Sequence, residues 1–228
     1  MQNKVSITFN RMFFSPELNI ETLSQILSKI PYDDSTGIGF TKVELIEDVL
    51  EVLLLKRVPT SIRTYNTTTE SFEDNDIFIF EEIDFYIDIK NNFIYTFGSA
   101  AKLNKAKNTL KAFVSNQITY ENIDLSIDKA LTRIELENWQ YDIKEITIKK
   151  FVFEEGASGK FVAKIHDQPV GRKLIEEYIS DIPKVILNIS SEEFDDFELS
   201  IGTSNSLSIK CVDEDTLIFI ESIKKVIV

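Results

Sequence analysis

The sequence predicts an α+β protein of two tandem related halves, in which a mainly antiparallel sheet carries helices on one face. The main observation is a weak internal repeat, because the apolar pattern of residues 83–114 recurs without gaps in residues 197–228. Each copy alternates, turns at polar residues, alternates again and then adopts helical spacing. The repeated unit is therefore strand–strand–helix. Strands outnumber helices in both halves, which favours an antiparallel sheet.

Two halves without a flexible linker are expected, with boundaries at 1–115 and 116–228. The chain of 228 residues contains only 7 Gly and 5 Pro, and no Pro- or Ser-rich stretch separates the halves. We therefore expect the halves to pack together. Whether they share one sheet is left open by the sequence.

The first half begins with an alternating strand over residues 4–10. Ser15 and Pro16 then predict a helix start, and Pro31 predicts its end after Ile30. Gly37 and Gly39 suit turns in the loop that follows. The run 49–55 is too apolar for its periodicity to distinguish a strand from a helix. The alternating residues that flank it and its β-branched content favour a strand. Residues 77–80 add a further strand before the first repeat unit.

The second half is expected to begin with a short helix over 123–131. A long strand follows over 133–153, with a break at Asn138–Trp139. Gly156 and Gly159 predict a hairpin turn. The remaining elements expected are a strand over 160–165, a helix over 171–182, a strand over 184–189 and a C-terminal helix after Asp213.

Acidic residues are concentrated in two stretches of a chain whose formal net charge is −13. Residues 70–90 contain eight carboxylates against Lys90, and residues 192–198 contain Glu192, Glu193, Asp195, Asp196 and Glu198. Solvated surface is the simplest interpretation. The alternatives are a platform for a basic protein partner, a mimic of nucleic-acid phosphates, or a site for a hard metal ion. The glycine and glutamate spacing of a calcium loop is absent after Asp74.

A lysine-rich segment lies in the helix expected after Ser99. It contains Lys102, Lys105, Lys107 and Lys111 and no acidic residue. Such lysines are typical of a solvent-facing helix whose stems cover apolar edges. Contact with nucleic-acid phosphates is the functional alternative. A second, looser basic region contains Lys144, Lys149, Lys150, Lys160, Lys164, Arg172 and Lys173, and exposed aromatic residues beside it would allow base stacking.

The single histidine, His166, lies in a polar loop between an expected strand and an expected helix. Shaping of the turn by Asp167 and Pro169 explains this loop without any function. In a functional loop, Arg172, Lys173 and the helix N-terminus would bind an anion, with His166 as a further donor. With one histidine, a zinc site that uses more than one is impossible within one chain.

Enzyme signatures are weak. Residues 154–160 depart from a phosphate-binding loop at its first glycine and at its final Ser or Thr. Asp88-Ile89-Lys90 and Asp142-Ile143-Lys144 match a minimal nuclease spacing that arises readily by chance. We therefore predict no catalytic residue, no metal ligand and no cofactor, and an enzyme is the less favoured class.

The sequence is expected to belong to a cytoplasmic protein without a membrane span. The N-terminal residues lack the apolar run of a signal peptide, and no segment approaches the length of about 20 apolar residues that a span requires. Cys211 is the only cysteine and occupies an apolar repeat position, which predicts a core residue. Trp139 is likewise expected in the core.

The function favoured by these observations is non-catalytic binding or assembly. Charged surfaces and sheet edges would act on a protein partner or on a second copy of the chain, giving a homo-oligomer. A nucleic-acid-associated protein is the first alternative, either by direct binding through the lysine-rich helix or by acidic mimicry. An unrecognised metal-dependent enzyme is the second.

Overall fold

The computed structural model describes residues 2–123, 125–191, 196–202, 206–212 and 216–227. The chain forms two compact units. The N-terminal unit comprises Met12–Thr96 and Ala101–Tyr120, and the C-terminal unit comprises the residues up to Arg11, Phe97–Ala100 and the chain from Glu121 onward. A division into related halves at residue 115 stays a prediction.

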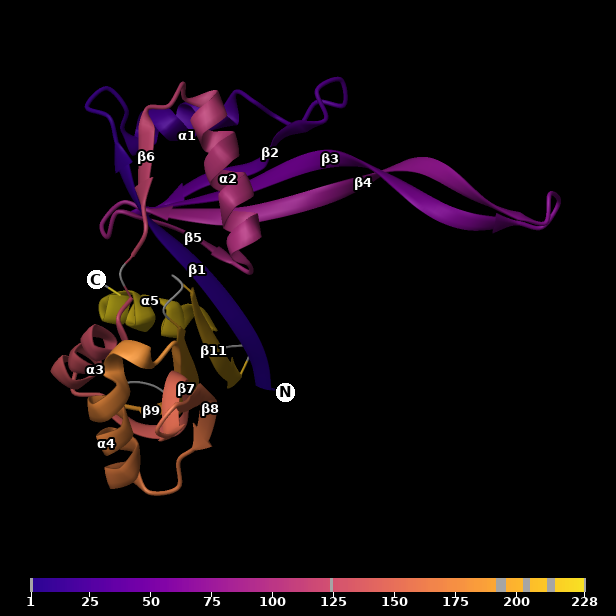
Figure 1. The fold of residues 1–228 in the computed structure, drawn as a ribbon. Coiled ribbons are helices and arrows are strands. Elements are labelled where there is room, and N and C mark those ends of the chain that lie inside the picture. The colour runs from indigo at the N-terminus through magenta and orange to yellow at the C-terminus, as the bar shows by residue number, and fades with distance from the viewer. Residues whose placement is uncertain (1, 124, 192–195, 203–205, 213–215, 228) are drawn as a thin grey trace. The chain divides into compact units, whose positions relative to one another are not determined.

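The N-terminal unit is an antiparallel sheet with two helices (Figure 1). Neighbouring strands follow the order β2-β3-β4-β5. The elements are the end of β1 (Gln2–Phe14), α1 (Ile20–Ser28), β2 (Ile38–Ile46), β3 (Val49–Asn66), β4 (Ser71–Asp88), β5 (Phe93–Phe97), α2 (Ala100–Phe113) and β6 (Ile118–Glu121).

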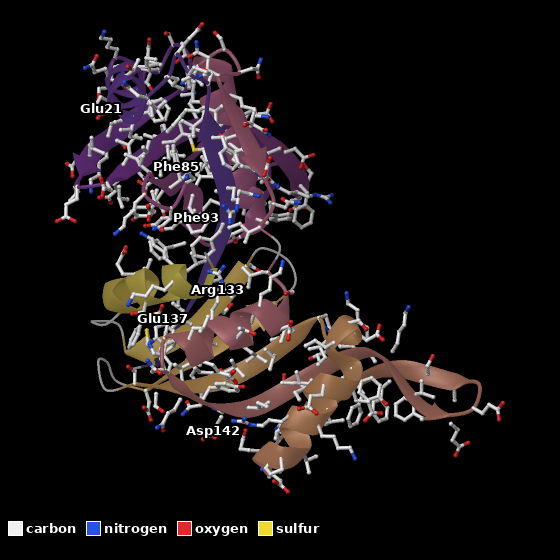
Figure 2. The ribbon with its side chains drawn as sticks, turned by 90° about the vertical axis from the view of Figure 1, so that its left-hand side faces the viewer. Glu21, Phe85, Phe93, Arg133, Glu137 and Asp142 are labelled. Atoms are coloured by element: carbon white, nitrogen blue, oxygen red, sulfur yellow. The ribbon has the colours of Figure 1, made fainter. Side chains whose placement is uncertain are left out.

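The core of this unit lies between one face of the sheet and both helices. Leu50, Val52 and Leu54 alternate along β3 and are fully buried, as their period of two requires. They join one hydrophobic cluster with apolar residues of α1 and α2. Figure 2 labels Phe85 of β4 among these side chains. The strand over 49–55, ambiguous by its period, is confirmed by this pattern.

The C-terminal unit is a second antiparallel arrangement, with strand order β1-β11-β10-β9-β7-β8. Its elements after β1 are α3 (Ile127–Leu136), β7 (Gln140–Glu154), β8 (Ala157–Lys164), α4 (Gln168–Tyr178), the 3₁₀ helix η1 (Ile179–Asp181), β9 (Lys184–Ser190), β10 (Phe197–Gly202), β11 (Ser206–Val212) and α5 (Thr216–Ile227).

Most predicted elements are present. Both strand–strand–helix segments occur, as the end of β4, β5 and α2 and as β10, β11 and α5. The hairpin between β7 and β8 turns at Gly156, whose φ of 83° favours glycine. Cys211 and Trp139 are buried as predicted. The duplication itself stays a prediction, and residues 203–205 and 213–215 of its second copy lie outside the described part.

The predicted start of the first helix is wrong. Asn19 is the N-cap of α1, because its side-chain oxygen accepts a hydrogen bond of 2.8 Å from the Thr22 amide. The backbone carbonyl of Ser15, and not its side chain, accepts from the Leu18 amide in a separate turn. The helix also ends at Ser28, two residues before the predicted end.

The predicted strand over 133–136 is wrong as well, because α3 continues to Leu136. Ser126 caps this helix by accepting from the Lys129 amide at 3.3 Å. Ile127, Ala130, Leu131 and Ile134 form its buried face with helical spacing. The exposed Leu136 made this segment resemble an alternating strand.

The helix after His166 begins three residues earlier than predicted, at Gln168, and its last predicted turn is η1. Pro169 lies in the first turn, where its missing amide proton costs nothing. Among the described residues, none of the helices has the length and hydropathy needed to cross a membrane.

Candidate binding surfaces

The lysines predicted as a nucleic-acid contact all lie on α2, and two of them form ion pairs within the N-terminal unit. Lys102 pairs with Asp84, and Lys105 pairs with Glu81. Both acidic partners belong to the acidic stretch 70–90. Part of that stretch therefore neutralises the lysine-rich helix.

The other two lysines of α2 lie over an aromatic ring. The Nζ atoms of Lys107 and Lys111 are 5.6 and 5.3 Å from the ring centroid of Tyr120. Burial, and then the neighbouring Lys111 charge, lower the pKa of Lys107. Burial raises the pKa of Tyr120. The structure thus brings these four lysines together on one helix, with acidic or aromatic neighbours.

The loop with His166 is exposed between β8 and α4, as its sequence predicts. Arg172 and Lys173 are also exposed, and the Arg172 guanidinium lies 5.5 Å from the ring centroid of Tyr141. The residue that fixes this loop is Gln168, which the sequence analysis did not single out. Its side chain accepts from the Ile143 amide at 2.7 Å and donates to the Ile143 carbonyl at 3.1 Å.

Arg172 also lines a pocket of about 390 Å³ in the C-terminal unit, together with Glu135, Trp139, Gln140, Tyr141, Asp142 and Ser190. Figure 2 labels Asp142 on β7. The Tyr141 hydroxyl donates to Glu135 at 3.0 Å, and burial is the main reason that the pKa of Tyr141 is raised. Two carboxylates and one guanidinium give this pocket mixed charge, and His166 and Lys173 are not among its lining residues.

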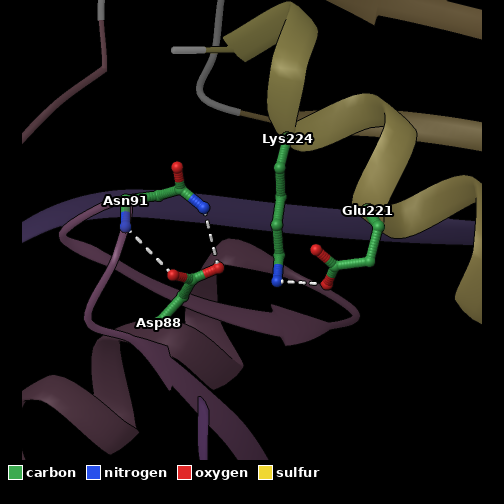
Figure 3. Close-up of polar contacts among 4 residues, drawn as sticks. All are labelled: Asp88, Asn91, Glu221 and Lys224. Carbon is green, nitrogen blue, oxygen red and sulfur yellow. Dashed lines mark hydrogen bonds and ion pairs between the residues drawn. The ribbon is translucent and has the colours of Figure 1, made fainter. Parts of the chain in front are cut away.

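Two buried charged side chains are held by local partners (Figure 3). In the N-terminal unit, both carboxylate oxygens of Asp88 accept 3.0 Å hydrogen bonds from Asn91, one from its amide and one from its side chain. In the C-terminal unit, Lys224 donates to Glu221 at 2.6 Å. Asp88 therefore closes the turn between β4 and β5.

The two nuclease-like triplets gain no metal-binding geometry. Lys144 of the second triplet pairs with Glu198 at 2.7 Å. Within the described ranges, no three His, Cys, Asp or Glu side chains are placed to bind one metal ion. The acidic residues Glu192, Glu193 and Asp195 lie outside those ranges.

Several exposed apolar side chains of the described residues lie on a two-stranded arm, which was not predicted from the sequence. We define the arm as residues 57–80, where β3 and β4 continue as a twisted ribbon beyond the helices of the N-terminal unit (Figure 1). The two strands pair without a register shift from Val49 opposite Asp88 to Asn66 opposite Ser71.

One face of the arm is aromatic. The register and the alternation of side chains place four rings on it, and each is between 53 and 61% exposed. This aromatic face consists of Tyr65, Phe72, Phe78 and Phe80. Arg57 lies 4.7 Å from the Phe78 ring centroid and Arg63 lies 4.9 Å from that of Phe72. Cation–π contacts therefore order the face without covering it.

The opposite face of the arm is aliphatic. It consists of Val58, Ile62, Ile77 and Ile79, of which Ile62 and Ile79 are 42 and 48% exposed. In the sequence, the feature that could have indicated an arm with two apolar faces is the run of four consecutive apolar residues 77–80. Such runs are typical of strands that are buried on both faces.

A second hairpin has the opposite charge. We define the basic hairpin as residues 149–164 of β7 and β8, which projects beyond α4 in Figure 2. It contains Lys149, Lys150, Lys160 and Lys164 against Glu154 and Glu155. Val152, Phe153 and Val162 are about half exposed. These lysines belong to the loose basic region predicted from the sequence, which does not show which aromatic residues lie exposed beside them.

Comparison with known proteins assigns no family, since no protein-family model matches the chain and no curated protein is significantly similar to it.

Proposed function

We propose that this chain is a non-catalytic binding or assembly protein, and that its arm contacts a protein partner or a second copy of the chain. The observation that carries this proposal is the exposure of apolar side chains on both faces of the arm. Four aromatic rings lie on one face, beside charged residues that include Asp74 and Asp76, and four aliphatic residues lie on the other. Exposed apolar patches rimmed by polar residues mark interaction sites in soluble proteins.

Stability gives an independent reason. A two-stranded ribbon in water is marginally stable, because it buries little apolar surface to offset its loss of conformational entropy. Ten residues of β3 continue past Lys56, where its pairing with β2 ends. A partner that covers the arm would supply the missing burial.

Charge and free strand edges define the partner further. The arm contains Glu70, Glu73, Asp74 and Asp76 against Arg57 and Arg63, which favours a basic partner. In the described part of the chain, β4 pairs with one edge of the distal part of β3, and no strand pairs with the other edge. That other backbone edge of β3 can pair with an added strand.

The test compares complexes formed in the protein's own source by the full chain and by an arm variant. Phe78→Ser with Phe80→Ser removes two exposed rings. Leu136→Ser is the matched control, because Leu136 is 74% exposed on α3 and lies outside the arm. Native electrophoresis of nuclease-treated extracts measures the complex in each case.

We expect a nuclease-resistant complex that is lost in the arm variant and kept in the control. A complex that is unchanged in the arm variant would contradict the proposal. A complex that disappears with nuclease treatment alone would also contradict it and would favour nucleic acid.

Nucleic-acid association is the second candidate, favoured by one observation. Phe153 is 55% exposed in the basic hairpin, so that a ring and lysines occur together as base stacking requires. Direct binding to single-stranded oligonucleotide would weaken after Phe153→Ala, and less so after Lys102→Ala, because Lys102 is paired with Asp84.

A further inference from the structure

The arm and the basic hairpin are complementary in charge. The arm has four carboxylates against two arginines, whereas the basic hairpin has four lysines against two glutamates. In the arm the carboxylates lie on or next to β4, and Asp74 and Asp76 share a face with Phe78. An acidic apolar strand and a basic apolar strand thus occur in one chain.

Both hairpins also offer a strand edge. β8 is the last strand in the order of the C-terminal unit and pairs with β7. Lys160, Val162 and Lys164 alternate along it on one face, and all three are exposed. In the N-terminal unit, β5 pairs with β4 at Tyr86–Asp88, far from the distal part of β4. Among the strands that the structure describes, none pairs with the outer edge of β8 or with the outer edge of distal β4, and such edges accept a further strand.

We propose that the arm of one copy docks on the basic hairpin of a second copy, with distal β4 adding as a strand at the free edge of β8. This inference rests on the proposed binding function and names its partner. The second copy is favoured over another basic protein because this chain itself presents an end strand with the required lysines and apolar residues. Opposite charges across paired strands would set the specificity.

The contact joins two different surfaces, so each copy retains one further arm or one further hairpin after a first contact. If these remaining surfaces meet within the same pair, a two-fold dimer closes. If they bind further copies, the contacts build a larger ring or an open chain. Since the contact is partly electrostatic, rising salt concentration should weaken it.

The test is sedimentation velocity of the purified full chain, over a range of protein and salt concentrations. The arm-reversed variant is Asp74→Lys with Asp76→Lys, and the hairpin-reversed variant is Lys160→Glu with Lys164→Glu. Glu17→Lys with Glu21→Lys is the control for the arm-reversed variant, because these exposed residues precede or begin α1 and their substitution changes the net charge by the same amount and sign. Circular dichroism establishes that each variant is folded.

We expect concentration-dependent oligomers of the natural chain at low salt. Each reversed variant alone should associate about tenfold more weakly or worse, and the control should associate like the natural chain. Mixing the two reversed variants should restore association. In that mixture the intact arm of one meets the intact hairpin of the other, and the two reversed surfaces are also complementary.

Three results would overturn the inference. These are a monomer at the highest concentration and lowest salt, unchanged association of the arm-reversed variant, or no recovery on mixing. Association that requires added single-stranded oligonucleotide would overturn it too. Failure of this inference can be distinguished from failure of the proposed function. If the purified chain is a monomer but still forms the arm-dependent, nuclease-resistant complex in extracts, only the inference fails. The arm would then bind a different protein, and the proposed function would stand.

Discussion

Phenylalanines on β4 serve two different purposes according to the face and the part of the strand on which they lie. Phe85 is fully buried on the core face, whereas Phe78 is 61% exposed on the arm. Both belong to the same uninterrupted pairing of β3 with β4. Burial in the core explains the first ring, and the proposed interface explains the second.

Substitution of these two rings should therefore differ in its effect on folding. Phe85→Ala is expected to lower the free energy of unfolding by about 3–5 kcal/mol, because it removes a fully buried ring. Phe78→Ala should cost under about 1 kcal/mol in the isolated protein. Urea unfolding followed by circular dichroism measures both. Equal losses would contradict the account of the arm as an exposed element.

Tyr86 provides a pH-dependent test in the N-terminal unit. Burial raises its pKa to about 12, with a smaller contribution from the Glu51 charge, and its ring stacks on Tyr95 at 5.1 Å. A raised pKa of a neutral acid means that folding favours the protonated form. Its stabilising contribution is complete below pH 10 and is lost as pH rises toward 12.

The free energy of unfolding of the natural chain should therefore fall across that pH window. In Tyr86→Phe the fall should be shallower, because this hydroxyl no longer ionises. Urea unfolding at several pH values measures the slopes, and tyrosinate absorbance follows the ionisation. Identical slopes in both proteins would show that Tyr86 is not a source of the pH dependence.

Gly171 tests the packing of α4 on β7. A Cβ atom at this position would lie 2.8 Å from Cγ2 of Ile165 and 3.2 Å from Cδ1 of Ile143. Gly171→Ala should lower the free energy of unfolding by about 1–3 kcal/mol through overpacking. Gly159→Ala is the control, because its added Cβ meets only Phe153 at an ordinary 3.5 Å. A neutral Gly171→Ala would indicate that α4 packs less closely.

At the scale of elements, the arm should be the less stable part of its own two strands. Residues 49–55 and 83–88 adjoin the core, whereas residues 57–80 form a two-stranded ribbon. Hydrogen exchange followed by mass spectrometry should show faster exchange of arm amides in the dissociated protein. Protection of those amides should then rise on association. Equal protection along both strands in the dissociated protein would contradict this view.

Regular alternation and helical spacing predicted most elements, because both follow from burial of one face. Helix starts were harder. Ser15 and Asn19 are both residue types that commonly cap helices, so the sequence does not distinguish them. In the structure the side chain of Asn19 caps the helix, whereas the carbonyl of Ser15 closes a separate turn. The extent of β4 was also missed, since residues 71–76, polar except for Phe72, pair in register with β3 although they bury no core residue.

At the scale of the whole molecule, charge pairing decides which predicted surfaces remain available. The sequence identified the lysines of α2, but it could not show that Lys102 and Lys105 pair with Asp84 and Glu81. Those contacts join residues far apart in the chain. The basic region near Lys160 could be predicted from residue types alone. The arm could not be predicted in this way, because the sequence does not show how far β3 and β4 continue beyond the core.

The net charge of −13 is therefore not a uniform field on this protein. Carboxylates on the arm and lysines on the basic hairpin are separated in sequence and belong to different hairpins. Segregated charge of this kind steers association with a complementary surface more than it stabilises a fold. That property agrees with a binding role for the chain.

The most direct test places a photo-crosslinking amino acid at position 78 of the full chain in its own source. Position 136 serves as the exposed control. We expect a protein adduct at position 78, mapped by mass spectrometry, and little at position 136. No protein adduct at position 78 above that control, or an adduct with nucleic acid instead, would contradict the claim that the arm is a protein-binding surface.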